Sequence, residues 1–210
     1  MDTSAVGAGL LVLIHLRTNL TTGALAALFH ISQSTVDRIL HHVALQPAPV
    51  SADAVLIIDA TLIPVHDQTI IAISNNYRRS VNTQALINAD NRRVVTVGRC
   101  WPGNRNDVVV ARATVAQLLT TGHQILGDGG YRAITSITTP RRDTTGRTIR
   151  DDYYRAHRRI RARVEHVIAR LKDWQILRQC WRRGQAVNHA LQIIAALWNL
   201  KTHKQLRVNF

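Results

Sequence analysis

The chain has 210 residues, enough for one full domain and a small additional one, with 46% hydrophobic and 19% charged residues. This composition excludes a wholly disordered chain and favours a sizeable core. The charge is unbalanced, because 27 Lys and Arg against 13 Asp and Glu leave a formal net charge of +14. Such an excess of cations favours a polyanionic partner, either nucleic acid or an anionic membrane surface.

The longest apolar run and the two cysteines narrow the choice of partner and compartment. The run over residues 5–14 is too short to span a bilayer, and it has neither a basic leader nor a cleavage site. Cys100 and Cys180 have no metal-ligand spacing and do not make a disulfide framework. We therefore expect a reduced, cytoplasmic protein that binds nucleic acid and no membrane.

The N-terminal segment has the pattern of a helical hairpin that binds DNA. A first helix is expected over residues 5–17. Residues 20–43 (LTTGALAALFHISQSTVDRILHHV) then predict a short helix, a turn and a second helix, capped by Thr21 or Thr22 and by Ser32. His30 stands in the turn where glycine is usual, and would have to tolerate a positive φ. The buried face is expected to consist of Leu25, Leu28, Ile31, Val36 and Ile39.

This layout is the helix-turn-helix, in which the second helix enters the major groove. Its candidate base-reading side chains are Gln33, Ser34, Thr35 and Arg38. A hairpin with a polar tip and no DNA contact is the alternative interpretation, and the basic charge favours the first one.

A proline-containing segment separates the hairpin from the rest of the chain. We expect a small all-α domain over residues 1–46, a linker over 47–54 and a second domain over 55–205. The second domain begins with VLIIDAT, residues 55–61, which predicts a buried central strand that ends near Asp59. A buried carboxylate is costly unless something such as a metal ion neutralises it. The alternative is an aspartate that caps the next turn.

The following segments predict further strands and a second aspartate beside them. Strands are expected over residues 69–74, 82–88 and 94–99, and a helix from Asn106 or Asp107 to about Leu119. HQILGDGGY, residues 123–131, then predicts a short strand that ends in Asp128, with glycines that allow a sharp turn. A basic loop over residues 140–151, a helix over 157–174 and an apolar helix over 188–201 complete the expected order.

The helix expected around residue 165 carries one acid among several cations. Arg158, Arg161, Glu165 and Lys172 share one face, because they lie three, four and seven residues apart. An ordinary surface salt bridge is one interpretation of Glu165. The other depends on Asp59 and Asp128, which would lie side by side if their strands were neighbours.

Strands followed by alternating helices and strands predict an α/β domain with a mixed sheet. Three carboxylates at one point cannot all stay ionised without cations, and hard oxygen ligands suit Mg²⁺ or Mn²⁺. Two such ions about 4 Å apart perform in-line displacement at phosphorus. We therefore predict metal-dependent DNA cleavage by Asp59, Asp128 and Glu165, with Arg161 and Lys172 holding phosphates.

These residues carry a resemblance to a family. The chain resembles bacterial insertion-sequence transposases of the DDE superfamily endonuclease type, in the insertion sequence 5 group. The resemblance implies a ribonuclease H-like catalytic fold, with Asp59, Asp128 and Glu165 as the catalytic triad and ligands of two Mg²⁺ or Mn²⁺ ions. It also implies cleavage and strand transfer at inverted-repeat ends, and a homo-oligomer on double-stranded DNA in the bacterial nucleoid. The matching stretches are LTTGALAALFHISQSTVDRI, VLIIDATLIPVHD, PGNRND, GDGGY and RARVEHVIARLKDWQIL.

Departures from the family pattern leave other functions open. Arg158 stands where related transposases often have a tyrosine, and it joins the DNA-binding candidates. The chain begins close to the hairpin, so we expect a DNA-binding domain that is shorter than in relatives. A catalytically silent DNA-binding protein derived from a transposase is the alternative, and a nuclease without strand transfer is a third. Trp181, among Arg178, Arg182 and Arg183, is expected either to pack or to stack on a base.

Overall fold

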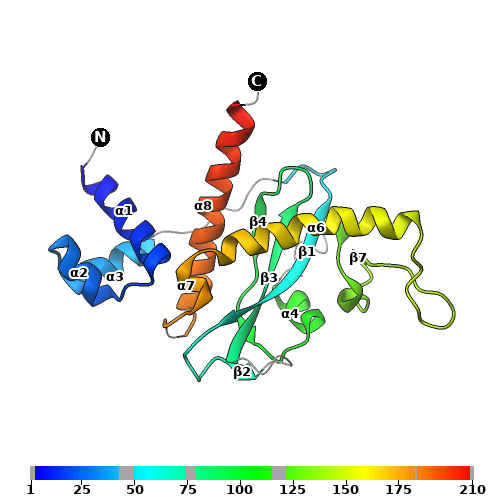
Figure 1. Cartoon of the computed structure of the whole chain (residues 1–210), viewed down its shortest axis with the longest axis horizontal. Helices are drawn as coiled ribbons and strands as arrows, with labels where there is room; N and C mark the ends of the chain where they lie inside the picture. Colours follow the sequence, from blue (N-terminus) through cyan, green and yellow to red (C-terminus); the bar gives the residue numbers. More distant parts are fainter. Residues whose placement is uncertain (1–2, 43–49, 74–78, 115–121, 183, 209–210) are drawn as a thin grey trace.

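The computed structural model of the chain describes residues 3–42, 50–73, 79–114, 122–182 and 184–208. An N-terminal group of three helices lies beside a long C-terminal helix, and a second long helix crosses a twisted mixed sheet (Figure 1). The helices are α1 (Thr3–Thr18), α2 (Thr22–Phe29), α3 (Gln33–His42), α4 (Asp107–Thr114), α6 (Asp152–Lys172), α7 (Gln175–Arg178) and α8 (Ala186–Val208), with a 3₁₀ turn, η1 (Gly129–Tyr131). The strands are β1 (Leu56–Pro64), β2 (Ala72–Ile73), β3 (Arg79–Asn88), β4 (Val94–Val97), β5 (Trp101–Pro102), β6 (Ile125–Leu126) and β7 (Ile137–Thr138).

The predicted helical hairpin is confirmed, together with its caps. The Thr21 hydroxyl accepts a hydrogen bond from the Ala24 amide at 3.2 Å, and the Ser32 hydroxyl accepts one from Thr35 at 3.2 Å. His30 ends α2 with φ 53° and ψ 41°. This is the left-handed conformation that glycine usually adopts at this position, as the sequence analysis expected. Local sequence therefore determines where both helices of the hairpin begin and where the first one ends.

The buried face of the hairpin differs from the prediction at one residue. Leu25 and Val36 are fully buried, as expected, and Leu40 is buried with them. Leu28 is 56% exposed, so its assignment to the core was wrong. The cause is the short α2, whose contact face is centred on Leu25 and continues to Phe29, four residues on, which packs against the same cluster.

The sheet has the mixed topology that the sequence predicts. β4, β3 and β1 are antiparallel neighbours, and β6 and β7 continue the sheet parallel to β1. Three antiparallel strands followed by two parallel ones, with a helix in the connection between them, form the expected ribonuclease H-like α/β arrangement. The short strands β5 and β7 were not predicted.

The central strand β1 places alternate side chains on opposite faces of the sheet. Ile57 and Ile63 join the hydrophobic cluster under α6 and α8, whereas Leu56 and Ile58 join a second cluster that includes Ala111 of α4. Asp59 has the same parity as Ile57, so its side chain lies on the α6 face. It was predicted near the end of its strand, but β1 continues to Pro64 and Asp59 lies in its middle.

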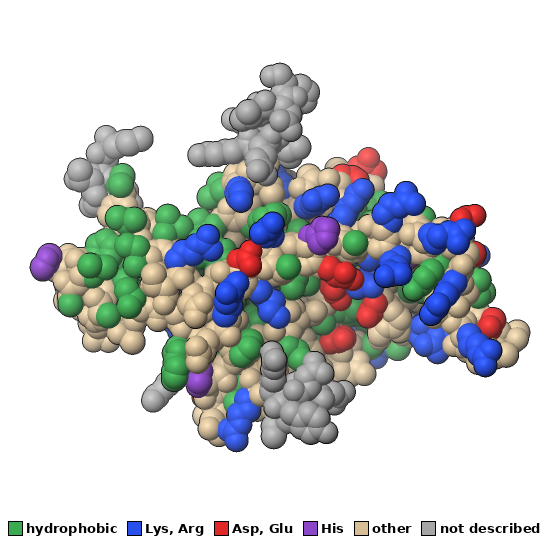
Figure 2. Space-filling model, viewed as in Figure 1, with side chains coloured by type: hydrophobic (Ala, Val, Ile, Leu, Met, Phe, Trp, Pro, Cys, Tyr) green, Lys and Arg blue, Asp and Glu red, His purple; other side chains and the backbone are tan. Residues whose placement is uncertain are grey.

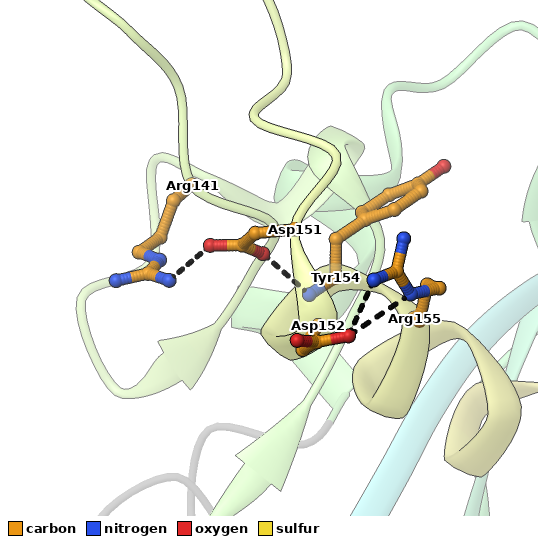
Figure 3. Close-up of polar contacts among 5 residues, drawn as sticks. All are labelled: Arg141, Asp151, Asp152, Tyr154 and Arg155. Atoms are coloured by element: carbon orange, nitrogen blue, oxygen red, sulfur yellow. Dashed lines mark hydrogen bonds and ion pairs between the residues drawn. The ribbon is translucent and has the colours of Figure 1, made fainter.

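Helix α6 begins five residues before the predicted start at residue 157. The cause is an N-cap: the Asp151 carboxylate accepts a hydrogen bond from the Tyr154 amide at 2.8 Å (Figure 3). Arg141 forms an ion pair with the same carboxylate, and Asp152 pairs with Arg155 on the first turn. The N-cap therefore extends this helix beyond its apolar stripe.

The N-terminal helices and the sheet domain share one hydrophobic cluster. Leu11 and Leu16 of α1 and Val36 of α3 belong to the same cluster as Ile194 of α8. The domain boundaries at residues 46 and 54 stay predictions, and linker residues 47–49 lie outside the described chain. Cys100 and Cys180 are buried free thiols. None of the described helices combines the length and hydropathy that crossing a membrane requires.

Candidate active site

Asp59 and Asp128 lie beside each other because their strands are paired in register. Leu56 pairs with Ile125 and Ile57 with Leu126 in the parallel β1–β6 ladder, so each aspartate stands two residues beyond the last pair. The expectation that the two strands are neighbours is confirmed.

Asp128 is fixed by the turn that follows β6. Its Oδ1 accepts a hydrogen bond from the Gly130 amide at 2.7 Å and caps η1. A Cβ on Gly130 would lie 2.9 Å from that oxygen, so the glycine is needed for the carboxylate to approach the backbone. The sequence GDGG therefore holds the second acid in a defined place.

Glu165 reaches the site from α6, which packs across the face of β1 to which Asp59 points. The Arg161 guanidinium lies between the two acids, with Nη2 at 3.4 Å from Asp59 Oδ2 and 3.6 Å from Glu165 Oε1. Asp59 has 19% of its side chain exposed and Glu165 has 59%. Figure 2 shows acidic side chains gathered in the middle of this face, among the Lys and Arg side chains that spread along it.

Burial and crowding change the acidity of Asp59. Burial raises its pKa to about 6, while Arg161 and the Ala60 amide act in the opposite direction. The nearby carboxylates of Asp128 and Glu165 raise the pKa further. At neutral pH the cluster therefore holds more negative charge than Arg161 neutralises, which favours a cation.

The chemistry of Asp59, Asp128 and Glu165 suits a divalent cation, although the three side chains do not meet at one point in this structure. Among the described residues, no three His, Cys, Asp or Glu side chains are grouped closely enough to hold one ion. Asp59, Asp128 and Glu165 offer only carboxylate oxygens, which suit Mg²⁺ or Mn²⁺. The exposed Glu165 has room to change rotamer, and Arg161 occupies the space between it and Asp59.

The predicted phosphate-binding cations have different surroundings. Lys172 Nζ donates to the Leu62 carbonyl at 3.0 Å and to the Thr61 hydroxyl at 3.2 Å, so it ties the end of α6 to β1. The side chain of Arg161 is 16% exposed and pairs with both Asp59 and Glu165. Its pair with Glu165 is the salt bridge that the sequence analysis gave as one interpretation of that acid. Arg158 is exposed on α6.

The predicted base-reading side chains lie on α3, mostly near its start. Gln33 Nε2 donates to the Thr22 hydroxyl at 2.8 Å, which links the two helices of the hairpin. The hydroxyls of Ser34 and Thr35 each lie 2.9 Å from the Ser32 hydroxyl. Arg38 is exposed, one turn further along α3. Their contact with DNA stays a prediction.

A loop that sequence reasoning treated only as a helix cap forms one wall of a polar hollow, which none of the three acids lines. Residues 103–107, together with residues 60–62 of β1, Asn82 and Gly130, line a polar hollow of about 550 Å³. Asn82 Nδ2 donates to the Asp107 carboxylate at 2.7 Å and to the Arg105 carbonyl at 3.1 Å, which fixes the loop. The signal in the sequence was the stretch PGNRND, which carried the resemblance and was assigned only a capping role.

Tyr131 was also missed by sequence reasoning. Its side chain is fully buried, and its hydroxyl has no hydrogen-bond partner among the described residues. Burial raises the pKa of this phenol, and the nearby acids Asp107, Asp59 and Asp128 raise it further, so the hydroxyl stays protonated. A neutral ring thus packs beneath the acid cluster.

The order of the strands in the mixed sheet is that of a ribonuclease H-like domain. The chain belongs to the DDE transposase family: residues 51–200 match the family described as the transposase DDE domain. Residues 8–44 match the helix-turn-helix of DDE superfamily endonucleases. Its function is therefore that of a DNA transposase.

Two relatives illustrate the range of this similarity. The chain is 45% identical over 205 residues to a protein from Streptomyces albus G, assigned as a transposase for insertion sequence element IS112. That match covers 91% of this chain and 78% of the relative. The Drosophila P element transposase, in its strand transfer complex, matches with 14% identity and a TM-score of 0.32. The alignment covers 64% of this chain and 35% of that one, so the chain spans about a third of that transposase.

Proposed function

We propose that the chain cleaves and joins DNA strands at the inverted-repeat ends of an insertion sequence, with Asp59, Asp128 and Glu165 as its catalytic acids. The observation that carries this proposal is the β1–β6 register, which puts the two aspartates side by side, with Glu165 on the helix across the same face. The motifs that resemble the insertion sequence 5 group support membership of that group.

Two Mg²⁺ or Mn²⁺ ions per site are part of the proposal. When bound, they would activate the attacking water or hydroxyl and stabilise the leaving oxygen. The three acids would hold them, because three carboxylates stand near a single guanidinium, that of Arg161. Arg161 would then leave the acids for a DNA phosphate, with the exposed Arg158 beside it, while Lys172 keeps α6 on β1.

Recognition of the DNA ends is assigned to the hairpin within residues 1–46. Gln33, Ser34, Thr35 and Arg38 would face the base edges from α3, since the start of the second helix enters the major groove in this motif. The net charge of +14 supports contact with two DNA segments, the element end and the target. We further propose a homo-oligomer on the DNA, acting on the nucleoid in the bacterial cytoplasm.

Asp128→Asn tests the chemistry without removing the DNA-binding surface. We expect it to abolish Mg²⁺-dependent cleavage of a terminal-repeat duplex while binding of the same duplex stays nearly unchanged. Asp152→Asn, on the exposed first turn of α6, is the matched control and should cleave like the wild type. Unchanged cleavage by Asp128→Asn would exclude the proposed role. Adding a target duplex and looking for joined product separates a transposase from a simple nuclease.

One observation favours a second candidate, a DNA-binding protein that has lost catalysis. Arg161 lies within 3.4 Å of Asp59 and 3.6 Å of Glu165, so an internal cation already occupies the place where a metal would bridge them. This candidate predicts binding of terminal-repeat DNA but no hydrolysis by the wild type in Mg²⁺ or Mn²⁺. The cleavage assay above therefore decides between the two.

A further inference from the structure

The segment that follows α7 is anchored against the far end of β1. Cys180 donates its amide to the Pro64 carbonyl at 3.1 Å, and its carbonyl accepts from the His66 amide at 3.0 Å. Gly184, with φ 55°, donates to the Asp67 carboxylate at 2.6 Å. Trp181 and Arg182, which lie between these two anchors, therefore have a fixed position on the surface.

Trp181 lies between these anchors and is exposed in an unusual way. Its ring stacks on His66, with 3.7 Å between ring centroids and 4° between ring planes. The residue is nevertheless 60% exposed, whereas the three other tryptophans are half-buried. Gln179 Nε2 lies 3.4 Å from His66 Nε2 and helps to fix the histidine ring. One face of the indole is thus supported, and most of the remaining ring surface is open to solvent.

A basic hollow adjoins this stacked pair. It has a volume of about 470 Å³, within the range of ligand sites, and His66 is part of its wall. Its charged lining residues are Arg79 and Arg178, and no described lining residue is acidic. Arg178 is 60% exposed and lies 3.5 Å from Asp173, which orients it along the surface. An aromatic face next to two cations suits a nucleobase and its flanking phosphates.

The site lies within reach of a strand bound at the acids. His66 follows Asp59 by seven residues, which corresponds to about 23 Å along an extended chain. Successive bases along a DNA strand rise by about 3.4 Å, so this span equals roughly seven base steps. A DNA strand that runs from the acids along the line of β1 would therefore bring a nucleotide about seven steps away to Trp181.

The neighbouring Arg182 has another role. Its Nη1 lies 2.6 Å from His15 Nε2 of α1, and Asn19 Nδ2 donates to the Gln179 carbonyl at 2.6 Å. The segment that carries Trp181 is therefore also a place where α1 and the residue that follows it meet the sheet domain.

We propose that Trp181, supported by His66, stacks an unpaired base of the bound DNA while Arg79 and Arg178 hold the adjacent phosphates. The inference rests on the proposed function for the presence of DNA, but it does not depend on the cleavage chemistry. Stacking on an indole is tolerant of base identity, so the site takes an unpaired nucleotide of any sequence.

Binding of labelled single-stranded oligothymidylate and of a matched duplex, measured by fluorescence anisotropy without metal, tests the site. Trp181→Ala should weaken single-strand binding about 5- to 160-fold, the effect of losing one base–aromatic stack. Trp181→Phe should retain most of the affinity, and duplex binding should change little in either variant. Tyr153→Ala is the matched control, because Tyr153 is 41% exposed and also lies against an arginine, 4.7 Å from Arg141.

A second readout keeps the test decisive if the alanine variant does not fold. Trp181→Leu keeps an apolar side chain without a ring, and 2-aminopurine in the oligonucleotide should be quenched by the wild type and by Trp181→Phe but not by this variant. Equal single-strand affinity in the wild type and the ring-free variants would overturn the proposal, as would an equal loss with single strand and duplex. Failure of the proposed catalysis would appear only in the cleavage assay, since these measurements contain no metal.

Discussion

Two buried titratable groups, one in each half of the molecule, face an arginine from a later segment, with opposite results. Asp59 lies against Arg161 of α6, and His15 lies against Arg182 after α7. Burial raises the pKa of Asp59 to about 6, and its arginine opposes that shift. Burial lowers the pKa of His15 to about 4, and its arginine lowers it further. An adjacent arginine stabilises a buried anion and helps to keep a buried imidazole neutral.

The two sites therefore differ in what they still require. His15 is neutral at pH 7, so its Nε2 accepts from Arg182 and its Nδ1 donates to the Leu20 carbonyl at 2.9 Å. This junction satisfies both ring nitrogens. The acid cluster holds three carboxylates near one guanidinium, so it is suited to a further cation. Burial with matched hydrogen bonds gives a structural contact, whereas burial with excess charge gives a site suited to binding.

The largest effect is expected from Arg161→Ala at high pH. Removing one partner of a largely buried ion pair leaves the Asp59 carboxylate uncompensated, so the free energy of unfolding should fall by about 3 kcal/mol at pH 8. The pKa of Asp59 is higher in the folded chain than in the unfolded chain. The destabilisation caused by its buried charge is therefore absent at a pH below the unfolded-state pKa, and it appears as the pH rises through about 6. Urea unfolding at pH 5 should therefore show a much smaller loss. An equal loss at both pH values, or the same loss in Arg161→Lys, would contradict the electrostatic explanation.

The next effect concerns the junction and has the opposite dependence on pH. The folded-state pKa of His15 is lowered, so the unfolded chain takes up a proton first as pH falls. The associated stability is complete above about pH 6.5 and is lost as pH falls towards 4, up to about 3 kcal/mol. His15→Gln removes the titrating group and should flatten this part of the profile. Urea unfolding of both proteins at pH 7 and 4.5 measures the difference, and parallel profiles would exclude His15 as the cause.

The smallest effect is expected where an ion pair is not buried. Asp152 and Arg155 pair on the first turn of α6 with 94% and 65% of their side chains exposed. Asp152→Ala should leave the melting temperature unchanged within error, because water and salt screen exposed pairs. Asp151→Ala, one residue earlier, removes the N-cap of α6 and should lower it. A larger effect of Asp152 than of Asp151 would show that exposed charge, not burial and capping, controls this helix.

Much of the candidate site was visible in the sequence because its signals are local. The apolar run around Asp59, the glycines after Asp128 and the shared helical face of Arg161 and Glu165 each depend on residues close together in the chain. The same holds for the capping role of Ser32 and the positive φ of His30, which the structure confirms. Periodicity and capping are properties of a single segment, so one sequence is enough to detect them.

The partners of these residues required the tertiary structure. Only packing decides that Arg161 lies between Asp59 and Glu165, and that Leu28 faces solvent. The same holds for the wall formed by residues 103–107, and for Trp181 stacking on a histidine 115 positions away. The sequence by itself determined the longer elements, the acids and the basic charge, since short-range sterics and hydrophobic pattern specify them. Tertiary structure alone decided which charged side chains form ion pairs and that the Trp181 ring stays exposed to solvent. Those contacts depend on how segments that are distant in the chain pack around one core.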